Sequence, residues 1–402
     1  MDKPKIRFKG YTEAWEQRKL EEIVERVTRK NQDLVSELPL TISAQYGLID
    51  QNEFFDKRVA SKDVSGYYLI YNGEFAYNKS TSSDAPWGAI KRLDRYENGV
   101  LSTLYIVFSI KSEEVVNSDF LVTYYDTNNW HKDVQAIAAE GARNHGLLNI
   151  APADFFKTQL MIPQNIEEQK KIGDYFKLLN NLITLHQRKC DETKKLKKYM
   201  LQKMFPQNDE KIPEIRFSGF TEAWEQRKFG DVGSVAMCKR IFKEQASDEG
   251  DVPFYKIGTF GGTPDAYISR ELFEEYKKAY QYPSKGDILI SASGSIGRTV
   301  EYTGKDEYFQ DSNIVWLKHG DDIDNAFLKV LYSVVEWSCE GSTIKRLYND
   351  NFLKTEFMLP YKEEQTKIGD FFSQLDNLIT LHQRKCDELQ KLKKFMLQNM
   401  FV

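Results

Sequence analysis

The sequence predicts an α+β fold, in which two mixed α/β globules are each followed by a long helix. Three observations predict it. The 402-residue chain contains the same two blocks twice, the repeated tails have a helical spacing of apolar residues, and short β-branched or aromatic segments lie between the blocks. The repeat length, roughly 200 residues, is far too long for a solenoid. We therefore expect two copies of a whole module.

The repeat consists of a short block and a long block. The short block, residues 6–19, returns at 215–228 with two changes, at Lys9 and Tyr11. The long block, residues 167–205, returns at 363–401 with 30 of 39 positions identical. Between the blocks each half has a divergent region. These boundaries predict globular domains at 1–158 and 207–355, and long helices within 159–206 and 356–402.

The long blocks have the pattern of a coiled-coil seam, because their apolar positions alternate in steps of three and four. Some 35 residues without proline would span about 50 Å as a helix. Pro163 and Pro360 come just before the expected helix starts, and Pro206 follows the first helix. The predicted seam positions are Ile172, Phe176, Leu179, Ile183, His186, Cys190, Met200 and Met204, with Ile368, Phe372, Leu375, Ile379, His382, Cys386, Leu389, Met396 and Met400 in the second copy.

The divergent regions have a different pattern, which indicates sheet structure. Residues 101–110, 287–291 and 312–317 are short, β-branched or aromatic, and bounded by glycine, asparagine or aspartate, so we expect strands there. Residues 270–279 have the spacing of a short helix.

Composition restricts the class of protein. A hydrophobic fraction of 41% and a charged fraction of 29% are typical of a soluble globular chain. We expect no transmembrane helix and no signal peptide, and the four cysteines, without a C-x-x-C pair, suggest reduced thiols in the cytoplasm. The net charge of −4 means that any affinity for nucleic acid must come from local patches.

The usual catalytic motifs are missing from the sequence: we find no phosphate loop, no nucleophile elbow and no dinucleotide-binding loop. One pattern does match that of metal-dependent nucleases, namely Pro264-Asp265 followed by Glu275 and Lys277. That chemistry needs adjoining strands, whereas this stretch has a helical pattern, and the first half has no equivalent. A stand-alone DNA nuclease is therefore only an alternative, and we predict no catalytic residue, no cofactor and no metal.

Two pairs, His186 with Cys190 and His382 with Cys386, have the i,i+4 spacing of one helix face. Three interpretations remain open: a Cys₂His₂ zinc site, semi-polar seam residues that fix the register, or no special role. The region 185–205 also contains seven basic residues against two acidic ones. Such a charged run is either a solvated helix face or a surface beside a phosphate backbone or a partner protein.

Polar and basic residues on loops are the candidates for ligand binding, because short polar side chains can approach phosphates and base edges closely. The simpler alternative is a set of ordinary surface loops. Since these loops diverge between two otherwise similar modules, we expect two related but different ligands. The candidates are Lys79, Ser80, Arg92, Arg95, Arg143, Asn144 and His145 in the first half, and Ser291, Ser293, Ser295, Arg298, Lys345 and Arg346 in the second.

Three further motifs stand out: Gly-Phe-Thr-Glu-Ala-Trp-Glu-Gln-Arg-Lys at 219–228, Lys-Gly-Asp-Ile-Leu-Ile-Ser at 285–291, and Pro…Glu-Glu-Gln-x-Lys-Ile at 163–172 and 360–368. Together with the repeat, they make the chain resemble the specificity (S) subunits of type I restriction–modification systems, and the likeness covers nearly the whole chain. The resemblance implies two target recognition domains that each read half of a split double-stranded DNA site. It implies a non-catalytic chain whose two long helices pair as an antiparallel coiled coil.

The resemblance also implies partners. Two methyltransferase (M) subunits would dock on the long helices, restriction (R) subunits would join that core, and no membrane is involved. We expect the docking positions to be Leu182, Leu185, Leu378 and Leu381, which lie outside the predicted seam. Because the two readers differ in sequence, the DNA site should be asymmetric. A coiled-coil scaffold that binds proteins only is the remaining alternative.

Overall fold

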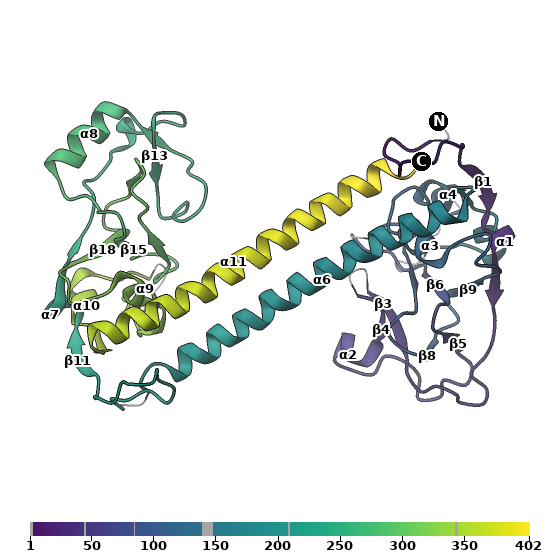
Figure 1. Cartoon of the computed structure of the whole chain (residues 1–402), viewed down its shortest axis with the longest axis horizontal. Coiled ribbons are helices and arrows are strands. Elements are labelled where there is room, and N and C mark those ends of the chain that lie inside the picture. The colour runs from purple at the N-terminus through teal and green to yellow at the C-terminus, as the bar shows by residue number, and fades with distance from the viewer. Residues whose placement is uncertain (1–2, 44–45, 84, 139–147, 208–209, 342–344) are drawn as a thin grey trace. The chain divides into compact units, whose positions relative to one another are not determined.

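The computed structural model describes the whole chain except residues 1–2, 44–45, 84, 139–147, 208–209 and 342–344. The described chain forms two compact units (Figure 1). The first unit contains residues 1–186 together with 384–402, and the second contains residues 187–383. Each unit thus combines one globule with a part of both long helices.

The first unit contains a four-stranded antiparallel sheet in the order β2-β9-β6-β7 and three two-stranded sheets, β1-β10, β3-β4 and β5-β8. Its elements are β1 (Glu16–Lys19), α1 (Leu20–Ile23), β2 (Val24–Val27), β3 (Leu40–Ser43), β4 (Gly47–Asp50), α2 (Gln51–Phe55), β5 (Tyr68–Tyr71), β6 (Phe75–Asn78), β7 (Ala89–Arg92), β8 (Asn98–Leu101), β9 (Ile106–Ile110), α3 (Ser118–Tyr125), α4 (His131–Ile137), α5 (Pro152–Phe155), β10 (Gln159–Ile162) and the first part of α6 (Ile166–Lys203).

The second unit contains a four-stranded antiparallel sheet in the order β12-β18-β15-β16, a three-stranded sheet β14-β13-β17 and the pair β11-β19. Its elements are β11 (Glu225–Lys228), α7 (Phe229–Val232), β12 (Gly233–Ala236), η1 (Lys243–Gln245), β13 (Val252–Tyr255), β14 (Tyr267–Ile268), α8 (Arg270–Ala279), β15 (Ile288–Ser291), β16 (Thr299–Glu301), β17 (Tyr308–Phe309), β18 (Ile314–His319), α9 (Asn325–Val334), α10 (Asn349–Lys354), β19 (Glu356–Leu359) and the first part of α11 (Lys362–Asn399).

The same frame recurs in both units. Strand β1 pairs antiparallel with β10, starting at Glu16 opposite Ile162, and β11 pairs with β19 in the same way, starting at Glu225 opposite Leu359. The two four-stranded sheets also have matching orders, with β9 and β18 in equivalent places. The repeat seen in the sequence is therefore a repeat of the fold, and the mixed α/β prediction is confirmed.

The element predictions hold with shifted limits. The predicted helix 270–279 is α8, and 287–291 is β15. The expected strand 101–110 is divided, since a turn at Ser102 to Tyr105 separates β8 from β9. The strand expected from 312 begins at Ile314, because the left-handed backbone of Ser312 (φ 52°) cannot extend it. The first residues of the two expected helical regions, 159–162 and 356–359, form the strands β10 and β19.

In each unit, a buried ion pair connects the long block to the short block. In the first unit, Arg7 donates two hydrogen bonds to the Glu168 carboxylate at 2.6 and 2.7 Å. In the second unit, Arg216 binds Glu364 in the same bidentate way at 2.7 and 2.8 Å. Both glutamates are fully buried. Bidentate geometry of this kind fixes orientation as well as charge, so it sets how each helix leaves its globule.

The next residue of the motif, a buried glutamine, connects the long helix to a second helix. Gln169 donates to the Pro163 carbonyl oxygen at 2.9 Å and accepts from the backbone N–H of Asn117, the N-cap of α3, also at 2.9 Å. Gln365 repeats this with Pro360 and with Asp324, the N-cap of α9. The repeated Glu-Glu-Gln sequence is thus explained by packing within each unit.

Within each unit, the segments of α6 and α11 that belong to it run antiparallel (Figure 1). In the first unit, Phe401 beyond the end of α11 packs between Trp15, Phe120 and Phe176, with ring centroids 5.7–6.0 Å apart. In the second, Phe205 beyond α6 packs in the same way on Trp224, Phe327 and Phe372. The predicted seam positions are all buried or half-buried, as a seam requires. The antiparallel pairing is therefore present inside each unit.

Candidate functional site

In the second unit, the fold brings together the two loops that the sequence singled out. Ser293 and Arg346 form an isolated antiparallel bridge. The N–H of Gly294 donates to the Lys345 carbonyl oxygen at 3.3 Å, and the N–H of Leu347 donates to the Ala292 carbonyl oxygen at 2.8 Å. Residues about 50 positions apart in the sequence thus form one continuous surface.

Both arginines of this surface are fixed in place by contacts with other residues of the unit. Arg298 is exposed, donates to the Ile257 carbonyl oxygen at 2.7 Å and lies over the Phe260 ring at 5.5 Å. Arg346 is half-buried and donates to the Ser312 hydroxyl at 2.9 Å. A guanidinium has five N–H donors, so each arginine keeps donors for a ligand while its position is fixed. Ser295 and Lys345 are exposed beside them.

Ser291 and Ser293, by contrast, are buried. The Ser291 hydroxyl donates to the Ser295 carbonyl oxygen at 2.5 Å and accepts from the Arg298 N–H at 2.9 Å. The Ser293 hydroxyl donates to Oδ1 of Asn313 at 2.8 Å. These two serines therefore shape the loops from beneath and do not form the outer surface.

A third loop, residues 310–313, completes this surface and was missed in the sequence. It links β17 to β18 and consists of Gln310, Asp311, Ser312 and Asn313. The Asp311 carboxylate pairs with Arg240 at 2.9 Å, and Gln310 accepts from the Ile257 N–H at 2.8 Å. The available signal was a run of four polar residues between the buried Phe309 and Ile314. We define the loop cluster of the second unit as residues 291–298, 310–313 and 345–348.

In the first unit, two segments that are far apart in the sequence also come together, one at Lys79 and the other at Leu148 to Ile150. The Lys79 carbonyl oxygen accepts from the Leu148 N–H at 3.0 Å, and its ammonium donates to the Ile150 carbonyl oxygen at 3.4 Å. Burial lowers the pKa of Lys79 below its ordinary value. Ser80 beside it is exposed. The other candidates here, Arg143, Asn144 and His145, lie outside the described residues.

Arg92 and Arg95 differ in exposure: Arg92 is largely buried and paired with carboxylates, whereas Arg95 is exposed. Arg92 is 13% exposed and is bound by Asp94 and Asp119, at 2.6 and 2.7 Å, and by the Ser118 hydroxyl at 2.7 Å. With two carboxylates on one guanidinium, this arginine joins β7 to α3. Arg95 is exposed and lies over the Tyr46 ring at 5.7 Å. Of the two, Arg95 has the geometry of a ligand-binding side chain.

Asp265 and Lys277 of the nuclease-like pattern pair with residues outside that pattern. Asp265 pairs with Lys256 at 3.0 Å, Lys277 lies 3.4 Å from Asp306, and Glu275 is on α8 as the helical spacing predicted. Within the described residues, no three His, Cys, Asp or Glu side chains are grouped so as to hold a metal ion.

Cys190 lies in the helix seam, with its thiol 3.7 Å from Gln383 Oε1.

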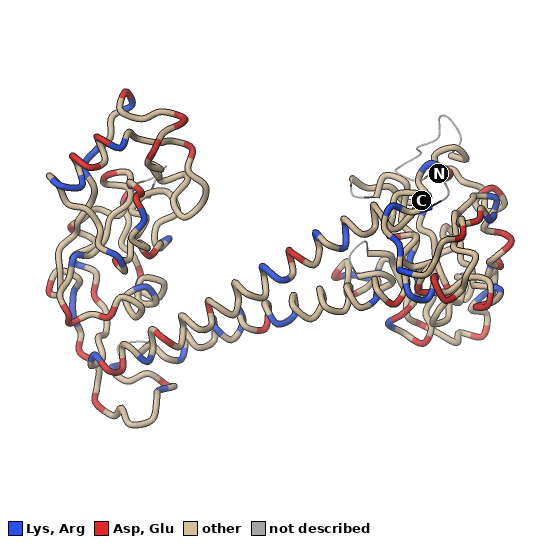
Figure 2. Tube along the Cα trace, turned by 45° about the horizontal axis from the view of Figure 1, so that its top comes forward, with Lys and Arg blue, Asp and Glu red and all other residues tan. Residues whose placement is uncertain are grey.

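The outer faces of the long helices carry the expected leucines. Leu378 and Leu381 are 44% and 59% exposed, whereas Leu182 and Leu185 are half-buried. The same two faces also expose Leu196 and Tyr199 on α6, and Leu392 and Phe395 on α11. Basic and acidic residues occur along both helices, and the basic ones predominate in the C-terminal half of each (Figure 2). Each unit thus presents an apolar strip on a charged helix pair.

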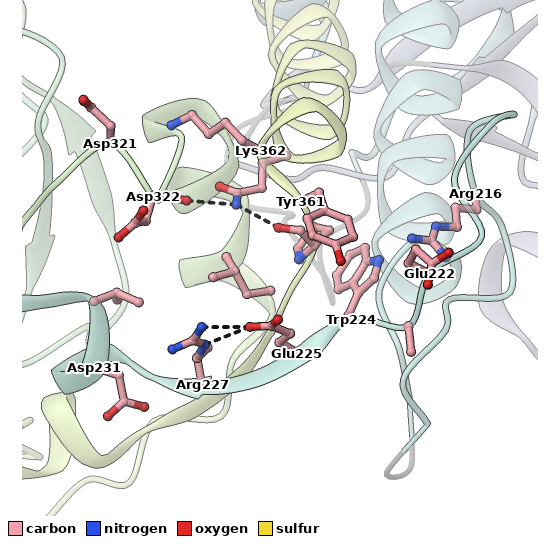
Figure 3. Close-up of a pocket in the computed structure, with 15 residues that line it drawn as sticks. Arg216, Glu222, Trp224, Glu225, Arg227, Asp231, Asp321, Asp322, Tyr361 and Lys362 are labelled. Atoms are coloured by element: carbon pink, nitrogen blue, oxygen red, sulfur yellow. Dashed lines mark hydrogen bonds and ion pairs between the residues drawn. The ribbon is translucent and has the colours of Figure 1, made fainter.

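A hollow of about 330 Å³ lies in the second unit, where the short block meets the start of α11 (Figure 3). Its walls carry five carboxylates and three basic side chains, and two of the latter are paired: Arg227 with Glu225 at 2.8 Å and Arg216 with Glu364. The Gln365 amide spans one wall, from the Pro360 carbonyl oxygen to that of Asp322. The excess of negative charge disfavours a phosphate ligand in this hollow.

The described helices offer no segment that is both long and apolar enough to cross a lipid bilayer.

Residues 221–391 match the family model of the type I restriction modification DNA specificity domain. A putative type I restriction enzyme specificity subunit of Haemophilus influenzae is 56% identical over 158 residues, which cover 38% of this chain and 41% of that relative. The chain thus aligns with less than half the length of that relative.

Two further likenesses extend over most of the chain. The putative type I restriction enzyme MjaX specificity subunit of Methanocaldococcus jannaschii is 21% identical over 416 residues, covering 95% of this chain and 91% of the relative. The crystal structure of a type I restriction–modification S subunit from M. genitalium superimposes with a TM-score of 0.63 at 12% identity, covering 100% of this chain and 99% of that one. Residues 221–391 therefore match a type I restriction modification DNA specificity domain, and the chain has the fold of a type I restriction–modification S subunit.

Proposed function

We propose that this chain is the DNA sequence-specificity subunit of a type I restriction–modification complex and that each unit reads one half of a bipartite, asymmetric target. The observation that carries the proposal is the identical frame of the two units, combined with loops that differ. The Arg7–Glu168 pair and the Arg216–Glu364 pair hold the same geometry. The residues at the loops do not repeat, so the two units present different chemistry on one scaffold.

In this proposal the second half-site is read by the loop cluster of the second unit. Arg298 and Lys345 are exposed cations there, and the cluster also contains the half-buried Arg346 and the exposed Ser295. Ser291 and Ser293 support these loops from below. The first half-site is read by Lys79, Ser80 and Arg95 with the segment 143–145. Arg92 takes a structural role in this unit, because its guanidinium is committed to two carboxylates.

The chain itself performs no chemistry in this proposal. Two methyltransferase subunits dock on the apolar strips of the long helices, one on each unit, since each unit repeats the same strip. Restriction subunits join this core and supply DNA cleavage. The docking positions are Leu182 and Leu185 in the first unit and Leu378 and Leu381 in the second.

The test is to map methylated positions in the genome of a cell that carries this gene with its methyltransferase partner. We expect one split motif with two unlike halves. Replacing residues 215–355 with the matching region of a relative should change one half and leave the other intact. A swap that alters both halves together would contradict two independent readers.

A single substitution tests which loop residues read bases. Arg298→Ala should relax recognition in the second half-site only, because an arginine on guanine contributes about 1–3 kcal/mol of discrimination. Gel retardation of the assembled complex on random DNA should weaken steeply with salt, as phosphate binding requires. Binding that does not respond to salt would favour a scaffold that binds proteins only. Cleavage or methyl transfer by the purified chain alone would contradict the non-catalytic role.

A further inference from the structure

We infer that Asn313 is a base-reading residue of the second half-site and that the buried Ser293 is its positioning residue. The inference rests on the proposed function, since it names the group through which one unit would read DNA. It starts from the loop 310–313, which the sequence patterns had not indicated. Three features of this loop carry the argument: a strained backbone, an oriented amide and a partly exposed position.

The backbone of this loop is strained at Ser312. Its φ of 52° is left-handed, a conformation that residues other than glycine rarely adopt. The strain is retained because Arg346 donates to the Ser312 hydroxyl at 2.9 Å and the flanking strands fix both ends of the loop. Residues held in such conformations cluster at functional sites, where the surrounding structure determines them. The result is a fixed direction for the next side chain, that of Asn313.

The amide of Asn313 is oriented by a buried hydroxyl. Ser293 is 7% exposed, and its O–H donates to Oδ1 of Asn313 at 2.8 Å. With the Ser293 O–H donating to Oδ1, the amide nitrogen Nδ2 is on the side of the group away from Ser293. Oδ1 keeps a second lone pair, and Nδ2 has no hydrogen-bond partner among the described residues. Asn313 therefore presents one acceptor and one donor side by side.

That pair of groups has a specific complement in DNA. An asparagine amide binds adenine through two hydrogen bonds, with the oxygen accepting from N6 and the nitrogen donating to N7. A phosphate offers only acceptors and would leave the oriented Oδ1 without a use. Arg346 is less suited to base reading at this point, since one of its nitrogens holds Ser312 and its guanidinium lies over the Tyr348 ring at 5.7 Å. The geometry favours adenine as the base that Asn313 reads.

The experiment uses the assembled methyltransferase complex and records methylated motifs genome-wide for the wild type and for variants. Asn313→Ala should relax one adenine position of the second half-site, reducing discrimination there by ~10-fold or more. Asn313→Asp, which keeps the shape and removes the donor, should lose the same adenine preference. Ser293→Ala should weaken preference at that position only. The matched control is Ser333→Ala, whose hydroxyl bonds to the Val330 carbonyl oxygen within its own helix, and it should leave the motif unchanged.

The outcomes separate the inference from the proposed function. If the wild type gives no split motif, the proposed function fails and the inference fails with it. If the wild type gives the motif and both Asn313 variants retain it unchanged, the inference alone is overturned. If both variants weaken methylation at all sequences alike, Asn313 contacts a phosphate or the fold, which also overturns base reading. A changed first half-site would overturn it as well.

Discussion

The ammonium of Lys393 lies 2.8 Å from the carboxylate of Asp126, which links the last turns of α11 to the C-cap of α3 in the first unit. The same carboxylate holds the Lys91 ammonium at 2.7 Å. In the second unit, Lys197 occupies the position equivalent to Lys393, but it pairs with Asp376 on α11 at 2.6 Å. The two helix ends are therefore anchored differently, although the frame that surrounds them is repeated.

Replacing Asp126 with asparagine should destabilise the first unit. Two lysine ammonium groups would lose their shared partner, and hydrogen bonds to charged groups contribute about 1.5–3 kcal/mol. We expect Asp126→Asn to lower the free energy of unfolding by about 2 kcal/mol, measured from urea unfolding. The control is Asp154→Asn, which breaks an exposed pair with Lys157 and should cost less than about 1 kcal/mol. Equal effects of both variants would contradict the anchoring role.

The Asp126 contribution should also depend on pH. Burial by itself would raise the pKa of this carboxyl, but the charges of Lys91 and Lys393 outweigh it and hold the pKa below the ordinary value of 3.8. A carboxyl with a lowered pKa in the folded state contributes stability above its unfolded pKa and loses it as the pH falls through the folded value. The stability difference between wild type and Asp126→Asn should be constant down to about pH 4 and shrink below it. A difference that grows on acidification would contradict this assignment.

At Gly173 the helix α6 packs closely against α3. A Cβ at this position would lie 2.8 Å from the Phe120 backbone nitrogen and from the Asp119 Cβ. Gly173→Ala should therefore separate the helices and cost about 1–3 kcal/mol of stability. Gly66→Ala is the control, because a Cβ there meets nothing within 4 Å. Gly369, 2.7 Å from Phe327 in the second unit by the same measure, should respond like Gly173.

The apolar strips should be required for assembly. Charged replacements at Leu182, Leu185, Leu378 and Leu381 should abolish co-purification of the methyltransferase, because a buried unpaired charge is costly at an interface. The matched control is Leu104→Asp, since Leu104 is 54% exposed but lies on a globule. Far-ultraviolet circular dichroism should confirm that the variant keeps its helices. Unchanged stoichiometry after all four changes would locate docking elsewhere.

Helix length should determine the spacer between the half-sites. Inserting four residues, about one turn or ~6 Å, after His186 and after His382 keeps the seam of the antiparallel segments in register. We expect methylome mapping to show a longer tolerated spacer with the same two half-sites. An altered half-site sequence would mean that the helices read bases.

The long helices and α8 could be predicted because periodic spacing is a local signal that packing reinforces. The loops at 291–298 were recognisable from their serines and glycines. The role of Arg92 was not, because Asp119, which binds it, is 27 residues away and only the fold brings the two together. Asn313 was missed because its loop is four residues long, and its significance comes from a serine twenty residues earlier. Whether a polar side chain supports a surface or forms it is decided by tertiary contacts.

The packing of Phe401 on Trp15, Phe120 and Phe176 has a consequence for synthesis on the ribosome. The second unit is one continuous stretch of chain, so it can fold as soon as it has emerged. The first unit must wait for residues 384–402, roughly 200 residues after its own globule. At 5–20 residues per second, its aromatic cluster stays uncovered for about 10–40 s. The nascent first unit should therefore bind chaperones for longer than the second, and folding should finish with the unit that was made first.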